Sequence, residues 1–457
     1  MRRAAWGALI HVALLGGWAP PARAREVPRR GELRLLVVLA GFPDLALSRP
    51  RAEFVGDPNA LVDRLVAYYT EVSAGRLRIV PHVGEAVVTL PRPRLAYVQR
   101  PDGLAADAVA AFAKAATAAA DRDALAAADA VLVFFAGTGK ESHATGPDMT
   151  DPWSNYTEVR PAALGFDEAC VVAEREREVE GKAIEPFGVL CHEFGHLLGL
   201  PELYATGGRP HEGIGLWGLM GHGTWVDLGR TPPHLEAWSK LRLGWVDAQV
   251  VEETTRRVEL PAVEETPTVV KIAAVPGRPQ EYYLLENRQR IGFDARLKGE
   301  GLLVWHVDEG VTGDRTAQNA PEHKLLHLVE ADGRGDLDRG HAHGGNRGDE
   351  GDPWRGPPPW RRRLGNGFGL AGAGLIGLAL YRITSPRALW PVLLRGSVAA
   401  VALAAASILR QGPVCGPGTP GMAPYGGEPV RIVIRNIAPS GRHMTVDILV
   451  APRGPGG

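Results

Sequence analysis

Two histidines and a glutamate near the middle of the chain have the types and spacing suited to metal-assisted hydrolysis. Residues 186–204 read PFGVLCHEFGHLLGLPELY and contain His192, Glu193 and His196 in the order His-Glu-x-x-His. On a helix, histidines four residues apart share one face and can bind one zinc ion. Glu193 then lies one step round the helix, where it can hold a water molecule and accept its proton. The motif therefore predicts hydrolysis by activated water.

The residues around the motif favour a helix. Pro186 suits a first helical turn. Apolar residues recur at helical spacing and form a stripe on the side away from the imidazoles: Phe187, Leu190, Phe194 and Leu197. One side of this active-site helix should therefore pack on the core while the other presents the two histidines.

A third metal ligand is expected just after the helix, because catalytic zinc usually has three protein ligands and one open position. Gly199 can end the helix with a positive φ and turn the chain back, which would bring Glu202 to the ion. A carboxylate oxygen is an acceptable zinc ligand. The spacing follows the metzincin pattern H-E-x-x-H-x-x-G-x-x-H, with Glu202 in place of the last histidine.

A glycine-rich segment downstream supplies a methionine and two further histidines. Residues 215–225 read GLWGLMGHGTW, and Met220 could form the apolar floor that a Met-turn places beneath the metal in metzincins. Simple core packing of Met220 is the alternative. His211 and His222 are rival ligands without the helical spacing of the first pair, and His222 could instead orient substrate.

The pattern of apolar residues predicts the strands and helices that must position these residues, and it divides the chain into an α/β region and a β-rich region. Up to about residue 200 the pattern is α/β, with strands expected at 33–40, 76–80, 86–90 and 130–136 and helices at 59–72 and 104–122. Later strands are expected at 269–275, 281–287, 301–308, 325–330, 430–437 and 444–450, with loop at 331–366. We expect a catalytic domain with a twisted sheet at 25–246, a β-rich, sandwich-like domain at 247–354, a low-complexity segment at 355–428, and C-terminal strands and tail at 429–457.

Composition and the N-terminus bound the class of protein. The chain has 457 residues, of which 45% are hydrophobic and 23% charged, so disorder throughout is excluded. A net charge of −1 argues against a nucleic-acid-binding surface over the whole protein.

A basic start, an apolar run at 4–18 and Ala22-x-Ala24 predict a signal peptide cleaved after Ala24, with a buried helix as the alternative. Export would permit a disulfide between Cys170 and Cys191, leaving Cys415 unpaired.

The apolar segment 389–409 is interrupted by Pro391 and Arg395. Its uninterrupted part, 396–409, is shorter than the roughly 20 residues that span a bilayer. A membrane anchor and a frameshifted reading of the gene both stay open, so contact with a membrane is undecided at this point. Translation of the other reading frames would test the second.

Several segments of the chain together resemble the immune inhibitor A-like bacterial zinc metallopeptidases. The resemblance covers about 33–354, resumes near Val430, and rests on residues 42–44, 69–77, 192–204, 215–225, 233–245, 301–309 and 328–352. It implies a secreted, metzincin-like metalloendopeptidase that acts on protein or peptide substrates, with an attached β-rich domain. His192, His196 and Glu202 would bind zinc, and Glu193 would be the general base and acid.

The chain departs from this family at two positions. Members usually have aspartate where Glu202 stands, and often an acidic residue after the tyrosine equivalent to Tyr204, where this chain has Ala205. Calcium sites occur in relatives, so we expect either a calcium site or a solvated turn in the acidic loop formed by Glu330, Asp332, Asp336, Asp338, Asp349 and Asp352. Two other functions stay open, a zinc hydrolase of a non-protein amide or ester and a catalytically silent, zinc-containing adhesin.

Overall fold

The computed structural model describes residues 27–98, 100–143, 150–158, 168–179, 181–273, 278–313, 316–357 and 432–450, together with Cys415, Met422 and Tyr425. The expected signal peptide at 1–24 and the apolar segment 389–409 lie outside the described residues. Within the described ranges, no helix is both long and apolar enough to cross a membrane.

The first sheet contains five strands in the order β2-β1-β3-β5-β4. These are β1 (Gly31–Gly41), β2 (Leu77–Thr89), β3 (Ala130–Thr138), β4 (Asn155–Glu158) and β5 (Glu168–Arg175). All neighbours are parallel except β4, which runs antiparallel to β5 at one edge. β1 and β3 are buried over most of their length, which explains why their sequences are continuous apolar runs.

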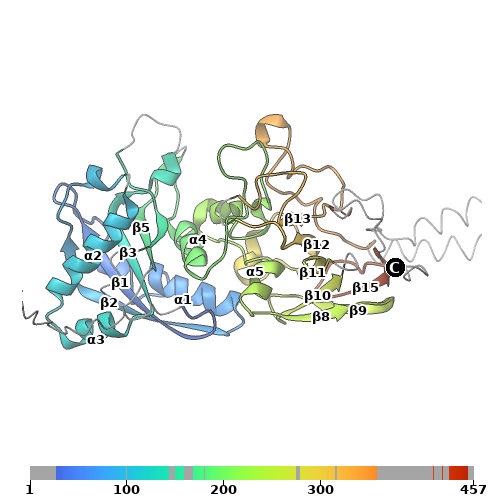
Figure 1. Cartoon of the computed structure of the whole chain (residues 1–457), viewed down its shortest axis with the longest axis horizontal. Helices are drawn as coiled ribbons and strands as arrows, with labels where there is room; N and C mark the ends of the chain where they lie inside the picture. Colours follow the sequence, from blue (N-terminus) through green and yellow to red (C-terminus); the bar gives the residue numbers. More distant parts are fainter. Residues whose placement is uncertain are drawn as a thin grey trace, which may run out of the picture.

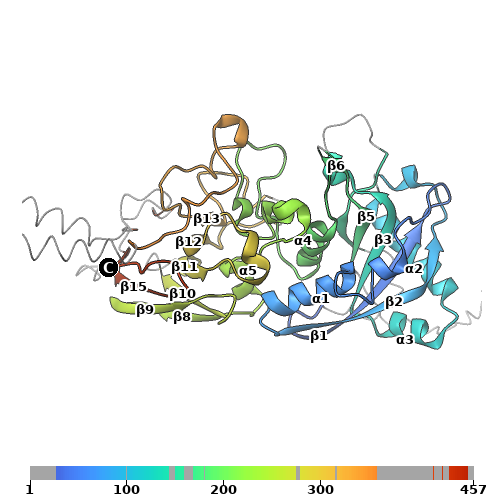
Figure 2. The same cartoon turned by 180° about the vertical axis from the view of Figure 1, so that it is seen from behind.

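Helices cover both faces of this sheet (Figure 1). α2 (Pro101–Ala115) and α3 (Ala119–Ala127) share a core with one face. α1 (Leu61–Val72) and α4 (Phe187–Leu197), which carries the His-Glu-x-x-His motif, share the core of the opposite face. Figure 2 shows α1 and α4 from behind, between the first sheet and the β-rich region.

Two predictions for this region were wrong. Residues 76–90 were expected to form two strands, but β2 is one strand with a register shift against β1. β2 tolerates Pro81 because it is an edge strand, so its unpaired side needs no N–H donor. The helix expected at 104–122 is divided into α2 and α3 by Ala116, whose ψ is 78°. Alanine propensity is local and did not reveal this break, which lets both pieces pack on the sheet.

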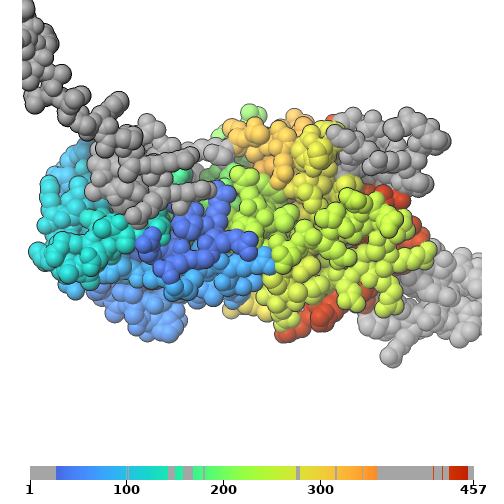
Figure 3. Space-filling model, turned by 60° about the horizontal axis from the view of Figure 1, so that its bottom comes forward, coloured from blue at the N-terminus to red at the C-terminus, as the bar shows by residue number. Residues whose placement is uncertain are grey.

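The described residues from Asp247 onward form two further main sheets. The second has the order β13-β12-β11-β10-β8 and contains β8 (Asp247–Val251), β10 (Thr268–Ala273), β11 (Glu281–Arg288), β12 (Gly301–Asp308) and β13 (Leu326–Leu328). The third has the order β14-β15-β9 and contains β9 (Thr255–Pro261), β14 (Ile432–Arg435) and β15 (His443–Val450). Figure 3 shows the C-terminal strand, in red, against the yellow-green segment that contains β9. Two short strands, β6 (Glu178–Val179) and β7 (Lys182–Ala183), form a hairpin, and α5 (Ala237–Arg242) precedes β8.

The second sheet is buried on both faces. Tyr282 and Trp305 point to one face and join the apolar core that contains α1 and α4. Tyr283 and Val304 point to the other face and share a core with the third sheet. The helix with the motif therefore lies in a layer between two sheets. Within 331–357, expected to be loop, the structure has only a short 3-10 helix and one isolated bridge.

The cysteine pairing considered from the sequence does not form. Cys170, Cys191 and Cys415 are all buried and free. The Cys170 thiol instead donates a hydrogen bond to the carbonyl of Glu193, at 3.1 Å. It therefore braces α4 without a covalent bond.

Candidate metal centre and active site

Helix α4 is held rigidly by its neighbour α1. The Tyr69 hydroxyl donates a hydrogen bond to the Cys191 carbonyl at 2.7 Å, and the rings of Tyr69 and Phe194 lie 4.9 Å apart. Leu190 and Phe194, from the predicted apolar stripe, are fully buried. The apolar side of α4 is thus fixed in the core, which directs the two motif histidines away from α1.

The end of α4 has the geometry expected for its glycine. Gly199 has a φ of +87°, the left-handed region that glycine adopts without steric cost. The N–H of Gly199 donates to the His196 carbonyl at 2.8 Å, and the N–H of Leu200 donates to the Gly195 carbonyl at 3.1 Å. These two bonds form a Schellman motif, which ends the helix and reverses the chain toward Glu202.

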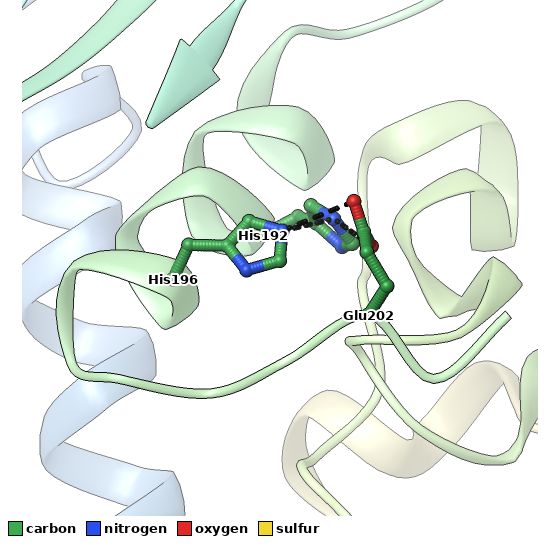
Figure 4. A group of neighbouring side chains, drawn as sticks. All are labelled: His192, His196 and Glu202. Atoms are coloured by element: carbon green, nitrogen blue, oxygen red, sulfur yellow. Dashed lines mark hydrogen bonds and ion pairs between the residues drawn. The ribbon is translucent and has the colours of Figure 1, made fainter. Parts of the chain in front are cut away.

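Three side chains meet at one point beyond this turn (Figure 4). The Nε2 atoms of His192 and His196 lie 3.1 Å apart. Glu202 Oε2 lies 3.2 Å from His192 Nε2, and Glu202 Oε1 lies 3.4 Å from His196 Nε2. A tetrahedral zinc ion with bonds of about 2.1 Å keeps its ligand atoms roughly 3.4 Å apart. Glu202 Oε2 is also buried without a hydrogen-bond partner, so the donor set fits a metal ion.

Hydrogen bonds on the far side of each imidazole orient it for such a role. His192 Nδ1 lies 3.1 Å from the Leu219 carbonyl and 3.1 Å from Thr224 Oγ1. His196 Nδ1 lies 2.8 Å from the Leu200 carbonyl. A carbonyl only accepts, so each Nδ1 carries the proton and each Nε2 keeps its lone pair for a metal. The Tyr204 hydroxyl donates to Glu202 Oε1 at 3.0 Å and steadies the carboxylate.

The electrostatics of the three donors favour positive charge at the point where they meet. Burial opposes the charged form of His192, but the Glu202 carboxylate outweighs it and raises the imidazole pKa. Burial likewise opposes the Glu202 carboxylate, yet the two histidines hold its pKa well below the usual range. A divalent cation would supply the same counter-charge.

Glu193 lies beside this group but is not one of its three members. Its Oε2 accepts a hydrogen bond from the Tyr156 N–H of β4, at 2.7 Å. Burial raises the pKa of the Glu193 carboxyl to about 8, and the charge of His196 acts in the opposite direction. Such a carboxyl is suited to accept and return a proton, which is the role that the motif predicts.

Met220 packs beneath α4. It is fully buried, and its carbonyl accepts the N–H of Leu203 at 2.9 Å. A Cβ atom on Gly195 would lie 2.5 Å from Met220 Sδ, so only glycine lets the helix approach this methionine so closely. Met220 therefore supports both the helix and the segment that returns to Glu202.

The rival histidines lie outside the donor group. His211 Nε2 lies 3.2 Å from the Asn319 carbonyl. His222 Nε2 lies 3.0 Å from Glu212 Oε2, and its ring lies 5.5 Å from the ring of Tyr204. His222 is thus adjacent to the donor group through Tyr204, without being a member of it.

The acidic loop forms two overlapping groups of oxygen donors. One contains Glu330, Asp332 and Asp352, and the other contains Asp332, Asp336 and Asp349. Asp352 Oδ2 accepts the Trp217 indole N–H at 2.8 Å, while its buried Oδ1 has no hydrogen-bond partner. Burial raises the pKa of Asp352 to about 7.

Asp338 was expected among the calcium ligands of the acidic loop, but the structure places it outside both donor groups. It belongs to neither group, because its carboxylate contacts the fully buried ammonium of Lys324. The charge of Lys324 requires a nearby anion, and Asp338 supplies it.

Sequence reasoning missed the residues that act through their backbone. The N–H of Tyr156 and the carbonyls of Leu219 and Leu200 carry no residue-type signal. Thr224 was within the glycine-rich segment, but nothing in its spacing indicated a contact with His192.

Comparison with known families agrees with this geometry. Residues 126–246 match the family described as immune inhibitor A peptidase M6, catalytic domain. A search of curated proteins found no match. The matched range contains α4, the three converging donors and Met220. Residues 126–246 therefore match an immune inhibitor A-type catalytic domain, and this match identifies the chain as a metallopeptidase.

Proposed function

We propose that the protein is a secreted, zinc-dependent endopeptidase in which His192, His196 and Glu202 bind the ion and Glu193 is the general base. One observation carries the proposal: two imidazoles and one carboxylate converge at tetrahedral spacing, with a second carboxylate beside them. Two nitrogen donors and one oxygen donor form a set typical of catalytic zinc, with one position left open. Gly199, Glu202 and Met220 together support a metzincin-like arrangement.

The residues of the chain divide the chemistry between them. When bound, zinc lowers the pKa of a coordinated water toward about 7 and polarises the scissile carbonyl. Glu193 accepts the proton of the attacking water and returns it to the leaving amine. The Tyr156 N–H holds the Glu193 carboxylate in one orientation, and Tyr204 holds Glu202. Water attack at a carbonyl next to an amide nitrogen is peptide hydrolysis, in agreement with the family.

Removal of the metal tests this proposal. We expect a chelator to abolish hydrolysis of denatured casein by the purified protein, and stoichiometric zinc to restore it. Glu202→Ala should lose zinc measured by elemental analysis, because two imidazoles alone leave the ion half coordinated. Tyr204→Phe is the matched control, since it removes only a hydrogen bond to Glu202 and should keep the ion. Activity that resists chelation would refute the metal dependence.

Two outcomes of the same assay would favour the other functions. Cleavage of small amides or esters without casein cleavage would indicate a non-protein substrate. Full zinc occupancy without hydrolysis of any acyl substrate would indicate a binding protein.

Secretion is supported by the N-terminal sequence. A basic start, an apolar run and the Ala22-x-Ala24 end form a signal peptide pattern. We expect protein recovered from the culture medium or periplasm to begin at Arg25, as measured by N-terminal sequencing. Cytoplasmic protein that retains Met1 would contradict this.

The acidic loop is a candidate calcium site of the same protein. Carboxylate oxygens are the ligands that calcium prefers, and Asp352, a member of one of the two groups, has a buried Oδ1 without a hydrogen-bond partner. The loop also contacts the active-site segment, since Asp352 accepts the N–H of Trp217, three residues before Met220. Bound calcium would stabilise that segment, and Asp352→Asn should lose this ion in equilibrium dialysis against calcium.

A further inference from the structure

Two glutamates meet at one edge of the first sheet, outside both donor groups described above. Glu141 lies in the 3-10 helix Lys140–His143, just after β3, and Glu176 directly follows β5. β3 and β5 are parallel neighbours, so their carboxyl ends bring the two residues together. The Glu141 carboxyl lies within hydrogen-bonding reach of Glu176, which is only 7% exposed.

Three of the four carboxylate oxygens of this pair are buried and, apart from each other and the neighbouring Ser142 hydroxyl, have no hydrogen-bond partner. They are Glu141 Oε1 and both oxygens of Glu176. The fourth, Glu141 Oε2, accepts the Ser154 N–H at 3.0 Å. A buried carboxylate without hydrogen bonds or counter-charge is strongly unfavourable. Two such groups facing each other either share a proton or bind a cation between them.

Among the described residues, no ion pair joins a basic side chain to Glu141 or Glu176. The Lys140 ammonium lies 5.4 Å from the ring centre of Trp153, and the Arg175 Nε donates to Ser48 Oγ. Arg94 pairs with Asp151. Burial, followed by the charge of Glu141, raises the pKa of Glu176 well above its usual range, as expected for a carboxyl that lacks a cation.

The backbone is shaped to admit these oxygens. A Cβ atom on Gly139 would lie 2.1 Å from Glu141 Oε1, so a larger residue at this position would displace the carboxylate. We propose that Glu141 and Glu176 bind one calcium ion, which these three buried oxygens coordinate while water completes the shell. Calcium fits because the donors are all oxygen, a carboxylate can bind it through both oxygens, and its coordination geometry is flexible.

This site would connect to the active site through strand β4. Ser154, just before β4, donates its N–H to Glu141, and Tyr156 within β4 donates its N–H to Glu193. A calcium ion on Glu141 would therefore fix the strand that orients the Glu193 carboxylate. This consequence rests on the proposed function, whereas the cation site itself does not.

The number of calcium ions bound per chain tests the site. Equilibrium dialysis of the full, zinc-loaded protein against calcium should give one fewer ion for Glu176→Gln than for the parent protein. Glutamine removes one carboxylate but can still donate an amide hydrogen bond to Glu141. If the two carboxyls merely share a proton, Glu176→Gln should keep the parent stoichiometry, and that result would overturn the site.

Matched variants separate this site from the acidic loop and from misfolding. Glu178→Gln alters an exposed glutamate two residues away and should bind as many ions as the parent. Asp352→Asn should lose the calcium ion of the acidic loop, whether or not Glu176→Gln is also present. If Glu176→Gln fails to fold by circular dichroism, Glu141→Gln provides the same comparison, and an unchanged calcium count for it would equally refute the site.

Activity provides a separate readout. With zinc content unchanged, Glu176→Gln should lower kcat on a peptide substrate several-fold, and Glu178→Gln should not. Loss of one calcium ion without any peptidase activity in the parent protein would leave the cation site standing and refute the proposed function. If Glu176→Gln keeps all calcium ions and the parent protein has normal peptidase activity, the cation site is refuted and the proposed function stands.

Discussion

Glu193→Gln is expected to lose nearly all peptide hydrolysis while retaining its metal. General acid–base catalysis by one positioned side chain contributes about 10²–10⁴-fold to a rate. The kcat of Glu193→Gln should therefore fall by about 10²-fold or more. Glutamine cannot accept the proton of an attacking water at neutral pH. The three converging donors are on other residues, so their geometry and the zinc content should not change.

The substitution fits the site without rearrangement. Glu193 Oε2 accepts the Tyr156 N–H at 2.7 Å, and the side-chain oxygen of glutamine can accept the same bond. Glutamine is isosteric with glutamate, so α4 and β4 should keep their packing. The loss of activity would therefore report the missing proton transfer and not a disturbed fold.

Single-turnover and steady-state rates on a fluorogenic peptide, with zinc content measured on the same samples, check this expectation. Glu178→Gln makes the same chemical change at an exposed position and should match the parent protein. Casein hydrolysis by Glu193→Gln at the parent rate would refute the assignment of Glu193 as general base.

The donor group could be predicted from the sequence because its parts are close in the chain. Two histidines four residues apart on a helix must share a face, and a glycine three residues later can reverse the chain. Those local rules brought Glu202 to the position the structure gives it, 3.2 Å from His192 and 3.4 Å from His196. The strands β1 and β3 were equally predictable, because burial on both faces leaves a continuous apolar run.

What the sequence did not reveal depends on distant contacts. The break between α2 and α3 follows from packing on the sheet, and alanine-rich sequence has no local signal for it. The pairing of Asp338 with Lys324 separates one acidic residue from five that look alike in sequence. Glu141 and Glu176 are 35 residues apart and meet only because β3 and β5 are neighbours.

A buried network of charges between α5 and β11 was also invisible in the sequence, and Arg288 is its centre. Its guanidinium binds Asp294 through two hydrogen bonds, with Nε to Oδ2 at 2.9 Å and Nη2 to Oδ1 at 2.6 Å. Arg288 Nη1 lies 3.4 Å from Glu286 Oε1 and donates to the Trp217 carbonyl at 3.2 Å. All three charged residues are fully buried, and the contact with Trp217 joins the second sheet to the segment that contains Met220.

We expect Arg288→Met to lower the free energy of unfolding by about 3–5 kcal/mol, the cost of leaving a buried ion pair without one partner. Burial opposes the charge of Arg288, but Asp294 and Glu286 raise its pKa, so the cation is part of the folded state. Removing it leaves both acids without the guanidinium that they contact. Chemical denaturation followed by fluorescence measures the change, and Arg290→Met, at an exposed position two residues away, is the control.

Charge and shape can be separated at this position. Arg288→Lys keeps the positive charge but cannot form two parallel bonds to Asp294, so it should lose less stability than Arg288→Met. Adding Asp294→Asn to Arg288→Met should recover part of the loss, because one uncompensated acid is removed. If Arg288→Met and Arg290→Met lose the same stability, the network does not hold the second sheet to the segment that contains Trp217 and Met220. A loss confined to Arg288→Met, accompanied by reduced kcat at full zinc occupancy, would instead show that the second sheet supports the segment beneath the metal.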